Sequence, residues 1–128
     1  MLDVARARDR MVDVQLARRG VRDRYVLDAM REVPREAFVE PGLEEFAYED
    51  GPLPIGKGQT ISQPYIVALM IEAAEVMPGD RVLEVGAGSG YAAAVLSRIA
   101  KRVYAIERHA MLGEAARRRF EDLGYDNV

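Results

Sequence analysis

The sequence has no cysteine and only one histidine, His109. The lack of cysteine excludes a disulfide framework, a thiol nucleophile and a cysteine-ligated metal site. Long apolar runs are also missing, because the longest, residues 65–71, is far shorter than the roughly 20 residues that a membrane-spanning helix needs. Residues 1–6 lack the apolar core of a signal peptide. We therefore expect a cytoplasmic protein that does not insert into a membrane.

Lysine is scarce as well, because only Lys57 and Lys101 stand among the 18 basic residues. The 21 acidic residues outnumber the basic ones and give a net charge of −3. The arginines within residues 6–19 are interleaved with aspartates, and the arginines of residues 117–119 follow a helical pattern. Both groups are interpreted as solvated helix faces. This balance gives no overall attraction to nucleic acid or to an anionic membrane.

With 128 residues, the chain is long enough for one structural domain with a hydrophobic core. Apolar periodicity and turn residues predict an N-terminal helical segment (1–50), a loop (51–64) and an α/β segment (65–128). The elements expected are helices over 3–19, 23–33, 65–76, 91–100 and 110–122, strands over 81–85 and 103–107, and the start of a third strand over 126–128.

The most informative segment, residues 82–96, combines a short buried strand, a glycine-rich turn and the start of a helix. Glycine lets the backbone turn sharply and approach a ligand, and a helix start presents unpaired N–H groups with a partial positive charge. The glycines are Gly86, Gly88 and Gly90, with the spacing G-x-G-x-G. The dinucleotide fingerprint is G-x-G-x-x-G, and Tyr91 stands where its third glycine belongs. The segment therefore predicts a nucleotide-type corner that is not suited to a dinucleotide.

Two acidic residues flank this corner. Glu84 lies two residues before Gly86, and Glu107 ends the next apolar run, residues 103–106. An acid beside the turn suits a ligand with positive charge rather than a pyrophosphate, and a carboxylate at the next strand end can accept hydrogen bonds from both ribose hydroxyls. An adenosine with a cationic tail and no phosphate, S-adenosylmethionine, fits this combination. The alternative is an ordinary turn between a strand and a helix.

Residues 51–64 contain three glycines and three prolines, a composition that predicts no regular structure. A loop of this length inside a compact domain is usually functional or disordered. Its polar tail, residues 59–63, is expected to return beside the glycine corner. Ser62 precedes Pro64 and an apolar helix, so it is a candidate N-cap. Because a helix N-terminus also suits a bound carboxylate, a structural and a functional role for Ser62 both remain open.

Two segments, 56–65 and 82–91, closely resemble the bacterial protein-L-isoaspartate O-methyltransferases. Segments 31–39, 103–108 and 123–128 support this resemblance, which covers nearly the whole chain. The glycine corner is typical of class I methyltransferases in general, whereas the earlier segment is far more specific. The resemblance implies an α/β, Rossmann-like class I methyltransferase fold, represented by its N-terminal helices and the first βαβα units of a parallel sheet. It also implies that residues 51–64 are a loop that contacts substrate and cofactor, and that residues 65–128 are an incomplete Rossmann-like domain that binds S-adenosylmethionine.

The resemblance also implies a reaction. Family members methylate the free α-carboxyl group of L-isoaspartyl residues in damaged proteins, with S-adenosylmethionine as the donor. The ester then closes to a succinimide that reopens partly to normal aspartate. A carboxylate is already ionised near neutral pH and the donor is an activated sulfonium, so no general base is needed. Catalysis is then mostly alignment, which supplies at most ~7–11 kcal/mol.

By the same resemblance, Ser62 is the catalytic residue, which positions the donor and the acceptor. The residues expected to bind the cofactor or shape its cleft are Thr60, Ile61, Gln63, Glu84, Gly86, Gly88, Ser89, Gly90 and Glu107. Of these, Glu107 is expected to hold the ribose. No metal is expected. The expected partners are isoaspartyl-containing proteins and peptides, and neither nucleic acid nor a membrane.

Two further hypotheses remain open. The chain can be a truncated, catalytically inactive fragment of this family that binds S-adenosylmethionine or a partner. With strands only at 81–85 and 103–107, the sheet has an unpaired edge, and such an edge can support self-association. A dinucleotide-dependent oxidoreductase is the other alternative, which Tyr91 in place of a glycine disfavours.

Overall fold

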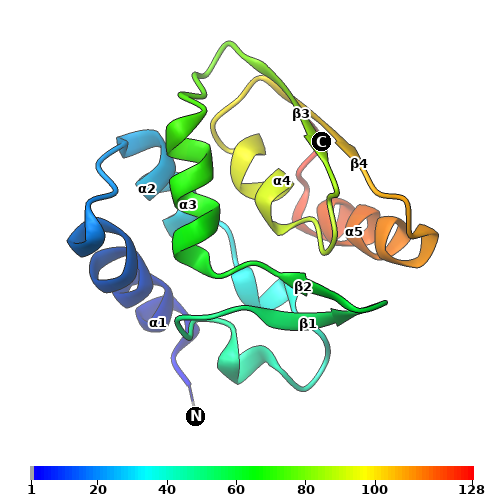
Figure 1. The fold of residues 1–128 in the computed structure, drawn as a ribbon, viewed down its shortest axis with the longest axis horizontal. Coiled ribbons are helices and arrows are strands. Elements are labelled where there is room, and N and C mark those ends of the chain that lie inside the picture. Colours follow the sequence, from blue (N-terminus) through cyan, green and yellow to red (C-terminus); the bar gives the residue numbers. More distant parts are fainter. Residues whose placement is uncertain (1) are drawn as a thin grey trace.

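The computed structural model describes residues 2–128, with a helical N-terminal half and an α/β C-terminal half (Figure 1). Its elements are α1 (Val4–Arg10), a π-helical segment (Met11–Leu16), a 3-10 turn (Ala17–Arg19), α2 (Arg24–Glu32), two further 3-10 turns (Arg35–Phe38 and Glu44–Phe46), β1 (Leu53–Gly56), β2 (Gln59–Ile61), α3 (Pro64–Ala73), β3 (Arg81–Val85), α4 (Tyr91–Ser97), β4 (Arg102–Ile106) and α5 (Ala110–Leu123). In Figure 1, α3 stands between α1 and α2 on one side and α4 on the other.

The N-terminal helices begin and end at the residues that the sequence predicts. The Asp3 side chain accepts a hydrogen bond from the Arg6 N–H at 3.1 Å, and Gly20 ends the helical segment with a φ of 104°. Between these limits the helix changes from α to π and then to 3-10 geometry. The prediction over 3–19 is therefore confirmed in extent, although the helix is not regular. Asp23 caps α2, which lies within the predicted 23–33.

The prediction that residues 51–64 have no regular structure is wrong. β1 and β2 pair in an antiparallel hairpin. Lys57 and Gly58 make its turn with φ angles of 55° and 68°, and a two-residue hairpin turn favours such positive angles. Pro54 is exposed in β1, and a strand with a free edge tolerates the missing N–H group. The glycines and prolines thus shape a hairpin instead of preventing one.

β3 and β4 form a parallel pair, with Leu83 opposite Tyr104 and Val85 opposite Ile106. These four side chains lie on one face of the sheet and are 60%, 50%, 76% and 54% exposed, respectively. The other face packs against helices, where Val103 is buried. One face of the sheet is therefore apolar and open among the described residues.

Both predicted strands of the parallel sheet are confirmed, although β4 begins and ends one residue before the predicted 103–107. The third strand expected over 126–128 is not formed. Asn127 nevertheless lies beside β4, because its carbonyl oxygen accepts the Val103 N–H at 2.9 Å. Its side-chain Nδ2 donates to the Ser97 carbonyl oxygen at 2.8 Å. Asn127 thus satisfies a carbonyl group at the C-terminal end of α4.

A hydrophobic cluster joins the N-terminal helices to the sheet and to the helices that cover it. Phe38 is fully buried in this cluster. Its ring centroid lies 5.8 Å from that of Tyr91 in an edge-on arrangement, and 6.3 Å from that of Phe120. The core therefore reaches the first residue of α4, directly after the glycine-rich turn. None of the helices within residues 2–128 has the length and apolar character needed to cross a membrane.

Candidate functional site: a glycine turn flanked by two acids

The segment between β3 and α4 is a tight turn that depends on glycine. Gly86, Gly88 and Gly90 have φ angles of 86°, 55° and 93°, a region that residues with a side chain rarely adopt. The N–H groups of Gly86 and Ala87 both donate to the Ile106 carbonyl oxygen, at 2.8 and 3.0 Å. The turn is therefore attached to the carboxyl end of β4, and ligands of parallel α/β sheets bind at this end of the strands.

The three glycines have different surroundings. A Cβ atom at Gly90 would lie only 2.8 Å from Phe120 Cζ, so Gly90 lets the start of α4 lie close to α5. A Cβ atom at Gly88 would lie 3.2 Å from Ile55 Cδ1 in β1, which places the hairpin against the turn (Figure 1). Apart from Gly86 and its two neighbours in the chain, no residue has an atom within 4 Å of the corresponding position at Gly86. The backbone of Gly86 is therefore open to a ligand.

Glu107 follows β4 and lies directly beside the turn. Its Oε1 atom accepts the Gly88 N–H and its Oε2 atom accepts the His109 N–H, each at 2.8 Å. The bonds from His109 and Gly88 hold the pKa of Glu107 below its ordinary value. The carboxylate is thus ionised and fixed in orientation, and each oxygen keeps a lone pair for a further donor. Two of the predicted binding residues, Gly88 and Glu107, are brought together by a direct contact.

Glu84 is the second acid of the site and belongs to β3. Burial raises the pKa of Glu84 to about 7, and the negative charge of Glu107 adds to this rise. The Glu84 Oε1 atom is buried and has no hydrogen-bond partner among the described residues. A buried carboxylate near a second carboxylate is unfavourable when ionised, and a bound cation would relieve that cost. The residues present therefore fit a cationic adenosyl donor.

β2 and the two residues that follow it carry the other predicted site residues. Thr60 and Ser62 are exposed, and the Ser62 carbonyl oxygen accepts a hydrogen bond from Arg35 Nη2 at 2.9 Å. Ile61 is only 3% exposed and packs in the core. The Ile61 side chain therefore anchors this segment to the hydrophobic core, whereas the Thr60 and Ser62 side chains face solvent.

The prediction that Ser62 caps the following helix is wrong. Gln63 occupies the N-cap position of α3 and makes no capping hydrogen bond with its side chain, while Pro64 is the first helical residue. The Gln63 side chain instead donates from Nε2 to Asp50 Oδ1 at 2.7 Å. Because proline has no N–H group, fewer donors at this helix start need a cap. The hydroxyl of Ser62 is thus not committed to capping α3.

Ser89, another predicted binding residue, is 4% exposed. Its hydroxyl oxygen accepts the Tyr91 N–H at 3.3 Å, and its carbonyl oxygen accepts a bond from Arg119 Nη1 at 2.9 Å. The Ser89 side chain therefore stabilises the turn. The prediction of a solvated arginine face is correct for Arg117 and Arg118, which are exposed, but it is wrong for the partly buried Arg119.

The model of the protein-L-isoaspartate(D-aspartate) O-methyltransferase family matches residues 6–128. The chain belongs to this family. A protein-L-isoaspartate O-methyltransferase of Methylorubrum extorquens is 71% identical over 122 residues, which are 95% of this chain and 54% of that relative. Protein-L-isoaspartate O-methyltransferase 2 of Pelobacter propionicus is 64% identical over 121 residues, which are 94% of this chain and 54% of that relative. The chain thus spans about half the length of the curated relatives it matches.

Solved structures of the family have the same fold. One protein-L-isoaspartate O-methyltransferase superposes with a TM-score of 0.84 at 36% sequence identity, over 94% of this chain and 40% of the other. A second family structure, from Plasmodium falciparum, was solved in complex with S-adenosyl-L-homocysteine. It superposes with a TM-score of 0.77 at 26% sequence identity, and the match covers 94% of this chain and 60% of the Plasmodium falciparum chain. The Rossmann-like fold class and the family predicted from the sequence are both confirmed.

In this family member, a groove of about 690 Å³ runs along β4 and α5. Ala87 and Glu107 belong to its lining, whereas Ser62 and Glu84 do not. His109 is the N-cap residue of α5, although its side chain makes no capping bond. The groove therefore coincides with only one side of the candidate site, the side next to Glu107.

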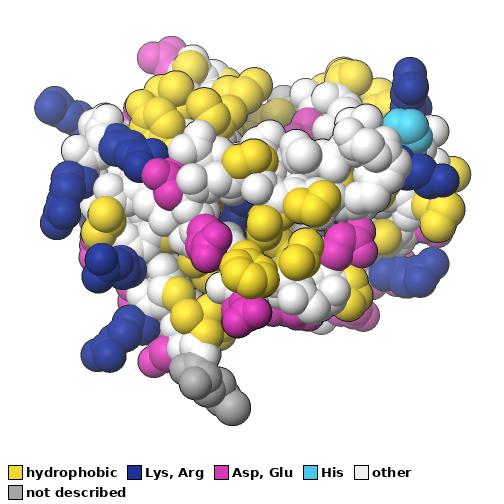
Figure 2. Space-filling model, turned by 60° about the horizontal axis from the view of Figure 1, so that its bottom comes forward, with side chains coloured by type: hydrophobic (Ala, Val, Ile, Leu, Met, Phe, Trp, Pro, Cys, Tyr) yellow, Lys and Arg dark blue, Asp and Glu magenta, His cyan; other side chains and the backbone are white. Residues whose placement is uncertain are grey.

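The distribution of charge on the hairpin side of the molecule is uneven. Figure 2 brings forward the face that lies at the bottom of Figure 1. Most lysine and arginine side chains in this view project at two opposite sides, and acidic and hydrophobic side chains occupy much of the middle. A surface with this arrangement does not resemble the continuous basic patch that binds nucleic acid.

Sequence reasoning missed one residue that contacts the candidate site from within the core. Arg35 bonds to the Ser62 carbonyl oxygen, and its guanidinium carbon lies 4.8 Å from the ring centroid of Tyr91. Arg35 falls in the segment 31–39, which contributes to the family resemblance. Nothing else in its local sequence separates it from the many arginines that are exposed.

Proposed function

We propose that this protein transfers a methyl group from S-adenosylmethionine to the free α-carboxyl group of L-isoaspartyl residues in damaged proteins and peptides. The observation that carries the proposal is the Glu107 carboxylate, which the N–H groups of Gly88 and His109 hold at 2.8 Å each beside the glycine turn. A carboxylate at this strand end is placed to accept both hydroxyls of a ribose. Family membership and the S-adenosyl-L-homocysteine of the Plasmodium falciparum relative support the same class of ligand.

The charges beside the turn favour a cationic donor over a dinucleotide. Glu84 and Glu107 are near enough that the charge of Glu107 raises the pKa of Glu84. A pyrophosphate placed here would add negative charge to two carboxylates, whereas an ammonium or sulfonium group would offset theirs. Tyr91, buried at the start of α4, also occupies the position where a dinucleotide-binding turn has its third glycine.

S-adenosylmethionine, when bound, supplies an electrophilic methyl group, which a carboxylate oxygen accepts while the electron pair of the broken S–C bond returns to sulfur. The protein needs no general base for this step, because the acceptor carboxylate is ionised near neutral pH. The roles left to its residues are binding and orientation. Glu107 holds the ribose, and the backbone at Gly86 and Gly88 approaches the methionine part of the donor. Ser62, exposed after the hairpin, positions the acceptor carboxylate with its hydroxyl and the neighbouring N–H groups.

The proposal is tested with a synthetic isoaspartyl peptide and S-adenosylmethionine carrying a labelled methyl group. We expect label to enter the isoaspartyl peptide as a base-labile ester and not to enter the same peptide with normal aspartate. Ser62→Ala is expected to lower kcat by about 10-fold or more, since one positioned hydrogen-bond donor can contribute this much. The control is Ser97→Ala, which removes a buried hydroxyl that donates to the Ala94 carbonyl oxygen at 2.6 Å. It should leave kcat unchanged in the folded protein.

A second candidate function is binding of the donor without turnover, together with self-association. The observation that favours it is the open apolar face of Leu83, Val85, Tyr104 and Ile106, because a second copy of the chain could cover such a face. Calorimetry with S-adenosylhomocysteine and sedimentation velocity distinguish the two candidates. Binding with no methyl transfer, and a dimer that Val85→Lys dissociates, would support the second candidate and contradict the first.

A further inference from the structure

Arg35 is an arginine with 0% of its surface exposed. Burial lowers the pKa of its guanidinium group, because a charge removed from water is unfavourable unless it is paired or hydrogen-bonded. No carboxylate within residues 2–128 forms an ion pair with it. Uncharged groups must therefore compensate the positive charge of Arg35, and the positions of these groups indicate the role of the residue.

Two carbonyl oxygens and one aromatic ring surround the guanidinium. Arg35 Nε donates to the Ala47 carbonyl oxygen at 2.6 Å, and Nη2 donates to the Ser62 carbonyl oxygen at 2.9 Å. The guanidinium carbon lies 4.8 Å from the ring centroid of Tyr91, a cation–π distance. The third nitrogen, Nη1, is buried without a partner among the described residues. The buried guanidinium of Arg35 is therefore compensated by two carbonyl oxygens and one ring, although one of its nitrogens has no hydrogen-bond partner among the described residues.

These contacts connect the two sides of the proposed site. Ser62 follows the hairpin and carries the hydroxyl assigned to the acceptor carboxylate, whereas Tyr91 directly follows Gly90 of the turn assigned to the donor. A guanidinium is planar and its donors point in fixed directions, so its contacts constrain how the Ser62 carbonyl group lies relative to the Tyr91 ring. We propose that Arg35 is a positioning residue, which acts through the Ser62 carbonyl group to place the Ser62 hydroxyl relative to the donor. This inference rests on the proposed methyl transfer.

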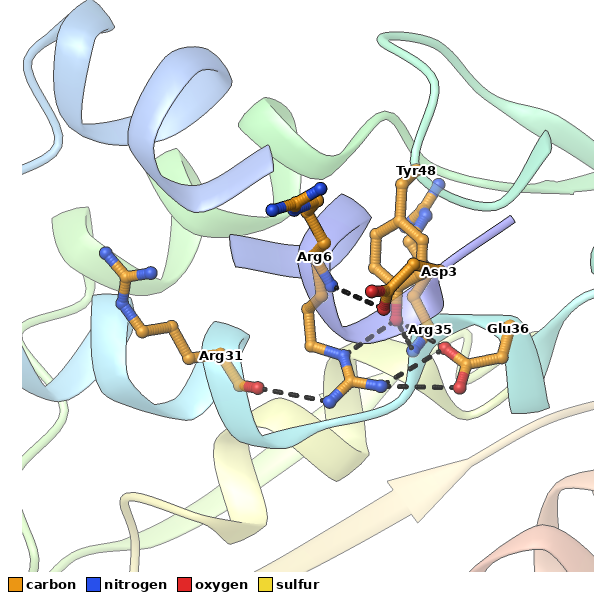
Figure 3. Close-up of polar contacts among 7 residues, drawn as sticks. Asp3, Arg6, Arg31, Arg35, Glu36 and Tyr48 are labelled. Atoms are coloured by element: carbon orange, nitrogen blue, oxygen red, sulfur yellow. Dashed lines mark hydrogen bonds and ion pairs between the residues drawn. The ribbon is translucent and has the colours of Figure 1, made fainter. Parts of the chain in front are cut away.

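The backbone of Arg35 is itself anchored to the N-terminal helices. Its N–H donates to the Tyr48 hydroxyl oxygen at 3.0 Å, and the same hydroxyl bonds to the Glu36 carboxylate (Figure 3). Arg8 of α1 donates from Nε to the Tyr48 hydroxyl oxygen at 2.9 Å and pairs with Glu36 at 3.3 Å. Partly buried polar networks of this kind are rigid when their members are satisfied. Arg35 therefore holds Ser62 from a fixed base.

Arg35→Lys separates positioning from charge. Lysine keeps the positive charge but lacks the planar fork, so one ammonium group cannot reproduce both bonds to Ala47 and Ser62. We expect kcat for an isoaspartyl peptide to fall by about 10- to 100-fold, as it does when reacting groups are misplaced by about 1 Å. The Kd for S-adenosylhomocysteine, measured by calorimetry, should change by less than about threefold, because the contacts of Gly88 and Glu107 remain.

The matched control is Arg98→Lys at the other end of α4. The Arg98 guanidinium carbon lies 3.9 Å from the ring centroid of Tyr125, and its Nη2 donates to Asn127 Oδ1 at 2.8 Å. The same substitution there should lower the stability and leave kcat unchanged. The inference is overturned if folded Arg35→Lys keeps the kcat of the wild type. It is also overturned if kcat and donor affinity fall by the same factor, as a general loss of structure would produce.

Tyr48→Phe keeps the test decisive if Arg35→Lys does not fold. It leaves the Arg35 side chain in place and removes the hydroxyl that bonds to the Arg35 N–H, to Arg8 and to Glu36. The base that holds Arg35 is then loosened, so a smaller decrease in kcat with unchanged donor affinity is expected. Unchanged kcat in folded Tyr48→Phe would then contradict the inference.

Backbone amide NMR gives a readout that does not depend on turnover. Signals of Ser62 and Gln63 should shift in Arg35→Lys, or in Tyr48→Phe if Arg35→Lys does not fold, and not in Arg98→Lys. If the wild type does not methylate the peptide, the proposed function fails, and this spectrum alone decides the role of Arg35. Unshifted Ser62 and Gln63 signals would overturn it.

Discussion

The Gly88 N–H donates to Glu107 Oε1 at 2.8 Å, so a residue of the glycine turn and the acid after the next strand form one unit. The second oxygen of Glu107 is engaged by the His109 N–H at the start of α5. One carboxylate thus connects the loops that follow two adjacent parallel strands. Its orientation is set before any ligand arrives, which reduces the ordering that binding would otherwise require.

Replacement of Glu107 by glutamine tests this preorganisation. The amide nitrogen of glutamine cannot accept a bond from Gly88 or His109, and the negative charge is lost. Hydrogen bonds to charged groups contribute about 1.5–3 kcal/mol, so the affinity for S-adenosylhomocysteine should fall by roughly 10- to 100-fold in calorimetry. Glu121→Gln, an equal change of charge at an exposed position of α5, should bind like the wild type. Equal affinities of Glu107→Gln and the wild type would remove Glu107 from the binding site.

Glu84 predicts a distinct dependence of stability on pH. Its pKa is raised from 4.5 to about 7, by burial first and by the charge of Glu107 second. The folded state therefore binds more protons than the unfolded state between these values, and stability falls as pH rises through this window. The decrease is about 3 kcal/mol if the full shift is expressed. Glu107 has the opposite shift, so its contribution is lost only when pH falls below the ordinary range of a glutamate.

Urea unfolding from about pH 5 to about pH 8 measures this effect. Glu84→Gln cannot ionise, so its free energy of unfolding should fall much less over this range than that of the wild type. Glu121→Gln, at an exposed site, should follow the wild type. Parallel pH profiles for the wild type and Glu84→Gln would show that Glu84 titrates normally in the folded protein.

The glycine turn and its acids could be predicted because their signal is local. Gly86, Gly88 and Gly90 all have positive φ angles, as a turn between a strand and a helix requires. Glu107 could be placed beside the turn because the carboxyl ends of adjacent parallel strands meet at one edge of the sheet. In each case a few consecutive residues determine the geometry.

The hairpin and the buried arginine could not be predicted in the same way. Glycine and proline in residues 51–64 interrupt strands in general, but here Lys57 and Gly58 take the angles of a tight turn, and the pairing of β1 with β2 decides the outcome. The role proposed for Arg35 depends on its contacts with Ala47 and Ser62, which are distant in sequence. Periodicity carries no information about such contacts.

Gly90 provides the sharpest test of how α4 is positioned. A Cβ atom there would lie 2.8 Å from Phe120 Cζ at a φ of 93°. Overpacking costs about 1–3 kcal/mol and a left-handed alanine about 1–2 kcal/mol, so Gly90→Ala should lower the free energy of unfolding by roughly 2–5 kcal/mol in urea titrations. Gly124 has a φ of 71° with nothing within 4 Å of the added atom, so Gly124→Ala should show only the backbone cost.

The contact with Phe120 can be isolated by a second substitution. In the Gly90→Ala background, Phe120→Leu removes the ring atoms nearest the added methyl group, so it should cost less than the same change in the wild type. The double-mutant cycle measures this difference directly. Additive effects, or equal costs for Gly90→Ala and Gly124→Ala, would mean that backbone angle alone makes glycine necessary here. The expected coupling would instead establish that the close contact of Gly90 with α5 sets the position of the turn that carries Gly88.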